Sequence, residues 1–224
     1  MPAFHPRPDA LPEEIGVFPL AGALLLPEGR LPLNIFEPRY LALVGDSLGR
    51  GRLLGMIQPD QAASEARGEG AAPALYRVGC LGRVTSFSET EDGRLLITLL
   101  GVVRFRVAAE LEGRAGYRRV RADYAGFLDD LVPDRPAPAF DRAGLMAALR
   151  PYFRSRRIEV NWDAIEQVPD TMLVTTLAMV CPFDPREKQA LLEAPDPEDR
   201  ARVLLTLLQM EVLGGPDAAS GPPS

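Results

Sequence analysis

Short apolar stretches separated by glycine and proline dominate the first half of the chain. Between Ile15 and Phe36 the apolar runs are interrupted by Pro19, Pro27 and Pro32. Prolines at this spacing exclude a helix but are tolerated at the ends and edges of strands. The pattern therefore predicts two or three short strands joined at glycine and proline corners.

The stretch LPLNIFEPRY, residues 31–40, joins one of these strands directly to a helix start. Pro38 follows Glu37 at the first helical position. This is a favourable entry, because proline needs no hydrogen-bond acceptor there and an acid suits the positive end of the helix dipole. Apolar residues then recur with helical spacing as far as Gly49 and Gly51. One early helix is thus predicted inside an extended region.

The rest of the first half reads as strands around one long loop. Residues 59–74 are small, polar and glycine-bearing, which predicts a flexible loop. The Glu91-Asp92-Gly93 sequence between two apolar runs is typical of a hairpin turn. The further strands are predicted at residues 52–58, 76–87, 94–100, 102–111 and 117–127.

The apolar period becomes helical in the second half. Asp184-Pro185 and Asp196-Pro197 each place an Asp cap before a proline at the first helical position. Helices are predicted at residues 140–155 (bent near Pro151), 158–166, 171–180, 186–193 and 198–213. The helix at 171–180 is apolar nearly all round, so we expect it to be central.

Together these elements predict an α+β protein. An antiparallel β pseudo-barrel with one early helix occupies residues 13–128, a Pro- and Asp-rich linker residues 129–139, and an α-helical bundle residues 140–214. Residues 1–12 and 215–224 are predicted to be disordered tails.

Composition narrows the class of protein. The 224 residues are 46% hydrophobic and 25% charged, with a net charge of −6, which disfavours general affinity for nucleic acid. No apolar run approaches the roughly 20 residues that span a bilayer, and the N-terminus carries prolines and acids where a signal peptide would be apolar. We therefore expect a cytoplasmic protein with no membrane partner, in which Cys80 and Cys181 are reduced core thiols.

The small number of histidine and lysine residues excludes most common types of catalytic site. The chain has one histidine, His5, and one lysine, Lys188. A Ser-His-Asp triad would have to use His5 from the N-terminal tail, and a phosphate-binding P-loop needs a Gly-Lys-Ser/Thr sequence that Lys188 does not provide. A zinc site needs about four His or Cys ligands, and the chain has three such residues. We expect no enzyme activity, no cofactor and no metal, although chemistry based on carboxylates alone stays open.

Four segments resemble a known family. FPLAGALLLPEGRLPLNIFEPRY (residues 18–40) and RLLGMIQP (52–59) are similar to the start of the Lon protease N-terminal, substrate-binding domain. GCLGRVTSFSETEDGRLLITLLGVVRFRV (79–107) resembles its central strands, and DPREKQALLEAPDPEDRARVLLTLL (184–208) its last helices. The resemblance covers about Ile15 to Leu213.

This resemblance has implications for fold and function. It implies a PUA-like β pseudo-barrel followed by a helical bundle. It also implies a stand-alone bacterial protein that lacks the ATPase and peptidase domains. Such a protein would bind protein or peptide segments without cleaving them, in the context of protein quality control.

The candidate binding residues each have a structural alternative. Asn34, Phe36, Arg39 and Tyr40 could edge a groove for an extended peptide, or the junction could serve only to fix the early helix on the barrel. Met56 and Phe87 could line an apolar peptide pocket, or could pack in the core.

RNA binding is the alternative function. Arginines gather beside Tyr117, and again beside Tyr152 and Phe153, as in proteins that stack single-stranded bases. These arginines could equally pair with the chain's 31 acids. They are Arg114, Arg118, Arg119 and Arg121 in the first cluster, and Arg150, Arg154, Arg156 and Arg157 in the second. Association of two copies through the helical bundle also stays open.

Overall fold

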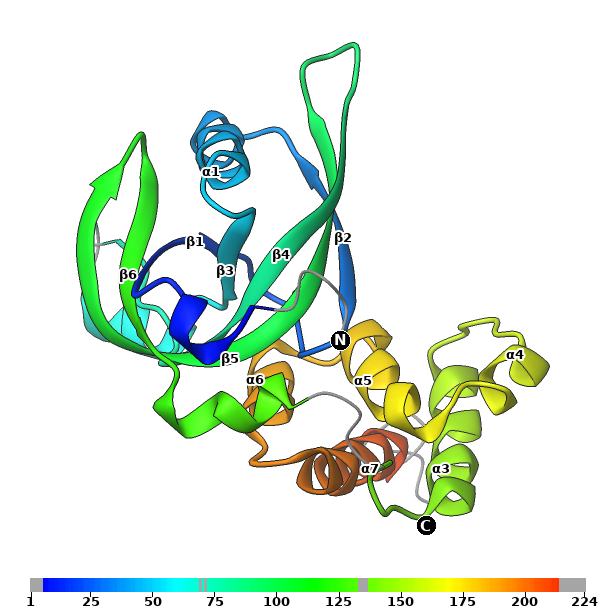
Figure 1. The fold of residues 1–224 in the computed structure, drawn as a ribbon. Coiled ribbons are helices and arrows are strands. Elements are labelled where there is room, and N and C mark those ends of the chain that lie inside the picture. The colour runs from blue at the N-terminus through cyan, green and yellow to red at the C-terminus, as the bar shows by residue number, and fades with distance from the viewer. Residues whose placement is uncertain (1–5, 69, 71, 133–136, 214–224) are drawn as a thin grey trace.

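The computed structural model describes residues 6–68, 70, 72–132 and 137–213, and these form an α+β fold (Figure 1). The strands are β1 (Glu14–Pro19), β2 (Arg30–Ile35), β3 (Leu53–Ile57), β4 (Val78–Glu89), β5 (Leu95–Arg114) and β6 (Tyr117–Asp123). The α-helices are α1 (Pro38–Leu48), α2 (Gln61–Ala66), α3 (Arg142–Ser155), α4 (Trp162–Glu166), α5 (Asp170–Val180), α6 (Pro185–Glu193) and α7 (Pro197–Leu213). Two 3-10 helices are η1 (Pro8–Ala10) and η2 (Ala125–Leu131).

The six strands form one sheet that closes on itself. Its order is β2-β5-β4-β3-β1-β6, and β5 also pairs with β6. Closure is possible because the 20-residue β5 pairs with β2 and β4 through its first part and with β6 through its last part, with irregularities in register between. The prediction of a wholly antiparallel sheet is wrong in one place, since β1 and β3 run parallel.

A close approach of two backbone segments fixes the position of β2. A Cβ atom on Gly101, in the middle of β5, would lie 1.9 Å from the carbonyl oxygen of Leu26. The amide of Glu28 donates to Gly101 and that of Gly101 donates to Gly29. Only glycine allows the chain before β2 to lie this close to β5.

The early helix begins where the sequence predicts. Pro38 is the first residue of α1 and Glu37 precedes it with an extended backbone. Tyr40, Leu43 and Val44 are buried, and the helix contacts β1, β3 and β6. Figure 1 shows α1 between the β4–β5 hairpin and the β5–β6 hairpin.

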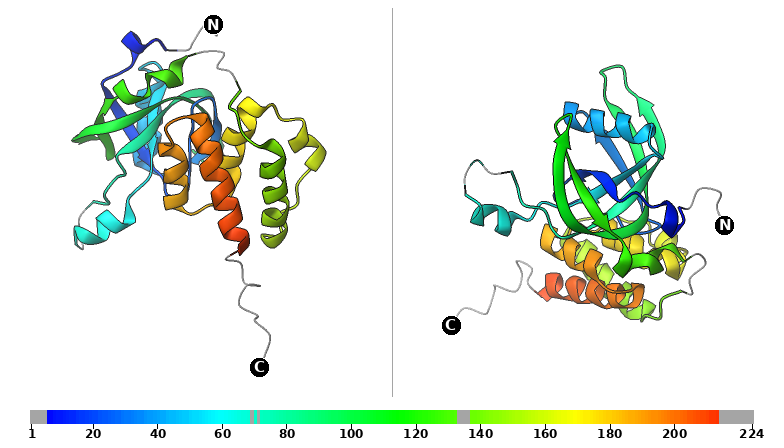
Figure 2. Two further views of the ribbon diagram at one scale, coloured as in Figure 1. Left: turned by 90° about the horizontal axis from the view of Figure 1, so that it is seen from below. Right: turned by 60° about the vertical axis from the view of Figure 1, so that its left-hand side comes forward.

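The helices of the second half lie together on one side of the sheet (Figure 2). The longest, α7, contacts α3, α5 and α6. Their starts follow the predicted capping signals: Asp184 accepts from the Glu187 amide at 2.8 Å in a complete capping box, and Asp196 accepts from the Asp199 amide at 2.8 Å. Pro151 lies inside α3.

Several segments differ from the sequence prediction. The two strands predicted at 94–100 and 102–111 are one continuous strand, β5, and the helix predicted at 158–166 begins only at Trp162. The predicted loop at 59–74 contains α2, whose cap Asp60 accepts from the Ala63 amide at 3.0 Å. The strand predicted to reach residue 127 ends at Asp123, and η2 follows it. Part of the predicted N-terminal tail forms η1. Residues 1–5 and 215–224 of the predicted tails, 133–136 of the predicted linker and 214 at the end of the predicted bundle lie outside the described residues.

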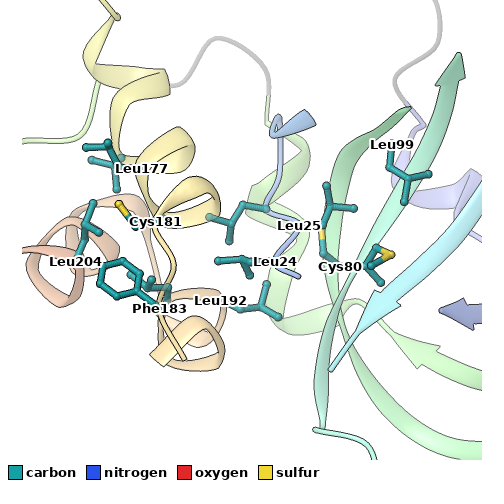
Figure 3. Close-up of a cluster of buried hydrophobic side chains, with 14 of the residues drawn as sticks. Leu24, Leu25, Cys80, Leu99, Leu177, Cys181, Phe183, Leu192 and Leu204 are labelled. Atoms are coloured by element: carbon teal, nitrogen blue, oxygen red, sulfur yellow. The ribbon is translucent and has the colours of Figure 1, made fainter. Parts of the chain in front are cut away.

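One hydrophobic core runs through both halves of the molecule. It joins Leu24, Leu25 and Leu99 on the sheet side to Leu177 and Leu204 on the helical side (Figure 3). A second cluster lies inside the ring, around Val17, Leu81 and Phe105. The boundaries of 13–128, 129–139 and 140–214 stay predictions, because the core does not stop at any of them.

Both cysteines are buried core thiols, as predicted. Cys80 is 1% exposed, Cys181 is 0% exposed and neither is in a disulfide. Burial raises the pKa of both thiols, that of Cys181 to about 12. Both side chains pack in the hydrophobic core.

Candidate functional site

The six predicted binding residues are spread over three environments. Met56 is 2% exposed and packs in the core, as its structural alternative predicts. Phe36 and Phe87 are exposed apolar side chains, with 61% and 48% of their surface accessible. A single exposed apolar side chain is common on protein surfaces, so these two positions indicate a contact surface only together with neighbouring apolar residues.

Register divides the residues on the sheet between its two faces. Asn34 pairs with Leu96, and Leu96 pairs with Ser88, so these side chains share one face. Phe87 pairs with Ile97 and belongs to the opposite face. Asn34 and Phe87 therefore cannot hold the same side of one ligand.

Asn34 and Phe87 both border a shallow groove, which we call the hairpin groove. It has a volume of about 480 Å³ and is lined by residues 32–34 of β2, 86–88 of β4 and 96–98 of β5. Leu96, which the sequence analysis did not single out, is 47% exposed here. The alternation of β5 contained this signal, since Leu96 falls between two residues that face the core.

Arg39 and Tyr40 lie in a second, smaller pocket of about 170 Å³. The guanidinium of Arg39 pairs with Glu37 at 2.7 Å and lies 4.6 Å from the centre of the Tyr40 ring. Burial raises the pKa of Tyr40. Tyr117, which also lines this pocket, donates its hydroxyl to Asp46 at 2.6 Å, and this bond lowers the pKa of the Asp46 carboxyl.

The edge of β2 is a further binding feature. β2 is the terminal strand in the sheet order and, among the described residues, pairs only with β5. Arg30, Pro32 and Asn34 are exposed along it. An edge strand offers backbone donors and acceptors to an added strand, although Pro32 contributes no donor.

A groove along α5 was missed by the sequence analysis. Two cavities, of about 420 and 210 Å³, share Glu28, Thr171 and Thr175 in their walls. Met172 and Val180 are 53% and 68% exposed at the smaller one. The prediction that α5 is central is therefore wrong for one face; its all-round apolar sequence was the available signal. We call these two cavities together the α5 groove.

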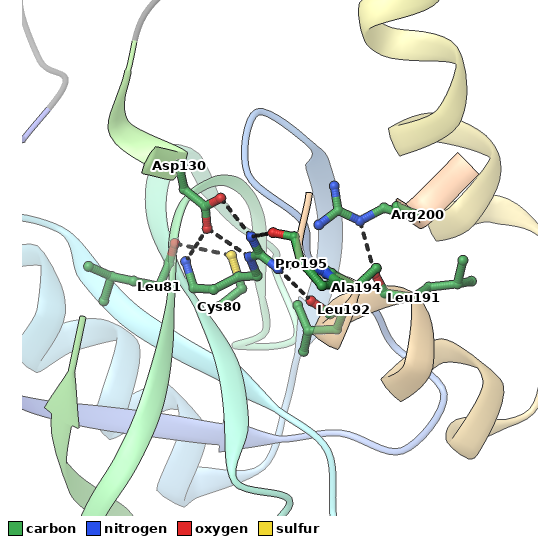
Figure 4. Close-up of polar contacts among 9 residues, drawn as sticks. Cys80, Leu81, Asp130, Leu191, Leu192, Ala194, Pro195 and Arg200 are labelled. Carbon is green, nitrogen blue, oxygen red and sulfur yellow. Dashed lines mark hydrogen bonds and ion pairs between the residues drawn. The ribbon is translucent and has the colours of Figure 1, made fainter. Parts of the chain in front are cut away.

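A buried polar cluster (Figure 4) includes Asp130 and Arg200, which both line the larger cavity. Arg104 of β5 binds both carboxylate oxygens of Asp130 in η2, at 2.8 and 3.0 Å. It also donates to three carbonyl oxygens at the C-terminal end of α6 and just after it, those of Leu192, Ala194 and Pro195. Because Arg104 and Asp130 are each 3% exposed at the side chain, the pair joins sheet and helices through desolvated charges.

Acids neutralise most of the arginines proposed for RNA. Among the described residues, six of the eight form ion pairs with Asp or Glu side chains. They are Arg114 with Asp46, Arg118 with Glu110, Arg119 and Arg121 with Glu14, Arg150 with Glu166, and Arg156 with Glu211. This pairing is the alternative to RNA binding that the sequence analysis named, and it weakens the RNA hypothesis.

The described residues hold few groups suited to catalysis. Lys188 is 7% exposed and donates to the carbonyl oxygens of Gly22 and Met179, so its amine is occupied in holding two segments together. His5 lies outside the described residues. No cluster of three metal-binding side chains occurs among the residues described, and no helix there is long and apolar enough to cross a bilayer.

Known proteins match nearly the whole chain. A family model described as the ATP-dependent protease La (LON) substrate-binding domain matches residues 14–210. "Lon protease 2" of Sorangium cellulosum is 30% identical over 217 residues, which cover 93% of this chain and 26% of that protein. "Lon protease 2" of Myxococcus xanthus is 27% identical over 220 residues, with 88% and 24% covered. The chain thus spans about a quarter of the length of these relatives.

Solved structures agree on the fold. The crystal structure of a Lon N-terminal domain protein from Xanthomonas campestris has a TM-score of 0.57 at 22% identity, with 86% of this chain and 97% of that chain covered. The N-terminal domain of the Mycobacterium avium complex Lon protease has a TM-score of 0.56 at 16% identity, with 87% and 97% covered. Sequence and fold agree, and the chain belongs to the family of ATP-dependent protease La (Lon) substrate-binding domains.

Proposed function

We propose that this protein is a non-catalytic module that binds extended segments of other proteins, in the context of protein quality control. Family membership supports substrate recognition, and the occupied amine of Lys188 supports the absence of catalysis. The closed ring of strands supports the PUA-like pseudo-barrel that the resemblance implies, with the packed helices α3 to α7 as its bundle.

The observation that carries the proposal is the free edge of β2 beside exposed apolar side chains. An extended segment paired with β2 would gain backbone hydrogen bonds and could cover Phe36 and Leu96. Recognition of this kind depends little on sequence, because the backbone supplies much of the affinity. It suits a module that meets many unfolded chains.

A binding titration with matched variants tests the proposal. The probe is a fluorescent, reduced and carboxymethylated polypeptide that cannot fold, followed by anisotropy. Phe36→Ser should weaken binding about tenfold or more, because burying a phenylalanine contributes about 1.5–3 kcal/mol. Met210→Ser, which removes a 62% exposed side chain from α7, is the control and should change little.

Two outcomes would overturn the proposal. One is no binding of the unfolded probe by the wild-type protein. The other is a gradual loss of intact probe in the presence of pure protein, which would reveal cleavage. Equal binding by Phe36→Ser and Met210→Ser would place the contact elsewhere than at the edge of β2.

A further inference from the structure

A buried guanidinium at the larger cavity of the α5 groove has an unfilled hydrogen-bonding position. Arg200 lies in the first turns of α7, is 5% exposed and lines the 420 Å³ cavity. Its Nε donates to the carbonyl oxygen of Leu191 at 2.9 Å, while Nη2 has no partner among the described residues. A buried charged donor without a partner is costly, and because the Arg200 side chain also lines the cavity, an acceptor that entered the cavity could satisfy its guanidinium.

The buried charges around Arg200 do not balance. Among the described residues, Arg104 and Arg200 contribute two positive charges, and the buried Asp130 contributes one negative charge that already binds Arg104 in two places. Burial, and then repulsion from Arg104, lower the pKa of Arg200 to about 10, so it stays charged at neutral pH. One further negative charge would complete the cluster.

The walls of the α5 groove define what can carry that charge. Thr171 and Thr175 line both cavities and share the wall of the larger one with Arg200. The smaller cavity beyond them is bordered by Met172, Met179 and Val180. An anion near Arg200 would therefore lie in a cavity that shares part of its wall with a second cavity bordered by apolar side chains.

We infer that the α5 groove binds the C-terminal carboxylate of a protein segment, with Arg200 holding the carboxylate and the cavity at Met172 holding an apolar terminal side chain. A carboxylate carries the single charge that the cluster lacks. A phosphate with two charges fits less well, because Asp130 and Glu28 also line the larger cavity. The inference rests on the proposed protein-binding function and adds a second contact away from the edge of β2.

Two versions of one peptide test this on the unmodified full chain. The probe is a fluorescein-labelled pentapeptide that ends in Leu-Met, with a free C-terminal carboxylate or with an amide. The acid should bind about tenfold tighter or more, which is the range expected for a hydrogen bond between charged groups. Replacement of the terminal Met by Asp should weaken the acid peptide by a similar factor.

Matched variants locate the contact. Arg200→Gln should reduce acid binding to the level of the amide, while Arg202→Gln, at a 71% exposed arginine of the same helix, should not. Thr175→Val keeps the shape of the wall and should weaken the acid peptide, which provides a test that survives if Arg200→Gln does not fold. Acetate should compete with the acid peptide more strongly than inorganic phosphate at equal concentration.

The results separate this inference from the proposed function. Equal binding of acid and amide, or stronger competition by phosphate than by acetate, would overturn the carboxylate site. If the unfolded probe still binds in a Phe36-dependent way, the proposed function stands. If neither the peptides nor the unfolded probe bind, both fail.

Discussion

Removal of the Asp130 side chain tests how sheet and helices are joined. Asp130→Ala deletes two hydrogen bonds to the Arg104 guanidinium, at 2.8 and 3.0 Å, and one to the Arg104 amide at 3.0 Å. It leaves the charge of Arg104 in a site that is 3% exposed. Loss of one partner from a buried ion pair costs about 3–5 kcal/mol, because the remaining charge stays desolvated.

The expected value lies in the lower part of that range. Arg104 keeps three carbonyl acceptors after the substitution, those of Leu192, Ala194 and Pro195. We expect a loss of about 3–4 kcal/mol in the free energy of unfolding. With a urea slope of about 2 kcal/mol per M, the midpoint should fall by about 1.5–2 M.

Urea unfolding followed by circular dichroism and by the fluorescence of Trp162 measures this shift. The control is Glu37→Ala, which breaks an exposed pair with Arg39 and should cost less than about 1 kcal/mol. Combining Arg104→Met with Asp130→Leu should recover part of the loss, since no charge is then stranded. A midpoint for Asp130→Ala no lower than that of Glu37→Ala would refute the reasoning.

Three further predictions concern packing and titration. Tyr152→Phe should leave the melting temperature unchanged or raise it, because the Tyr152 hydroxyl is buried without a hydrogen-bond partner among the described residues. Tyr117→Phe loses the 2.6 Å hydrogen bond to Asp46 and should lower the melting temperature by the equivalent of about 1 kcal/mol. Gly101→Ala should destabilise the protein by about 3 kcal/mol or more in chemical denaturation, because the new Cβ would overlap the backbone before β2. The control is Gly45→Ala in α1, where a Cβ meets nothing within 4 Å and should not destabilise the protein. In an NMR titration the Asp46 carboxyl should lose its proton at a pH below the usual aspartate range, and Tyr117→Phe should raise that midpoint. Because the pKa of Asp46 is depressed in the folded state, the stability that Asp46 contributes is present above the ordinary aspartate pKa. This contribution is lost as the pH falls through the lowered pKa. The tyrosine prediction is contradicted if Tyr152→Phe is less stable than Tyr117→Phe. The glycine prediction fails if Gly101→Ala and Gly45→Ala are equally stable. A normal midpoint for Asp46 would refute the titration prediction.

Local signals predicted the elements of this fold well. The Asp-Pro pairs at 184–185 and 196–197 predicted two helix starts, because a cap and a fixed backbone angle act within one turn. The Asp92-Gly93 turn predicted the β4–β5 hairpin for the same reason, and Gly93 has a positive φ of 78°. Such signals need no knowledge of distant residues.

The arrangement of the candidate sites depends on contacts that no local pattern encodes. Arg104 and Asp130 are 26 residues apart, and neither has a neighbour that announces a buried pair. The side chains of Asn34 and Phe87 face opposite sides of the sheet because of the pairing register between the strands. Irregularities such as the one between Val84 and Ser86 shift this register by a residue. The exposed face of α5 could not be told from its buried face, because its sequence is apolar all round.

Hydrogen–deuterium exchange on the full chain, with and without a saturating unfolded polypeptide, tests the central claim most directly. If an extended segment pairs with the free edge of β2, backbone amides within residues 30–36 should exchange more slowly in the complex, and those of the inner strand β3 should not change. Unaltered exchange throughout residues 30–36, at concentrations where the polypeptide is bound, would contradict the claim.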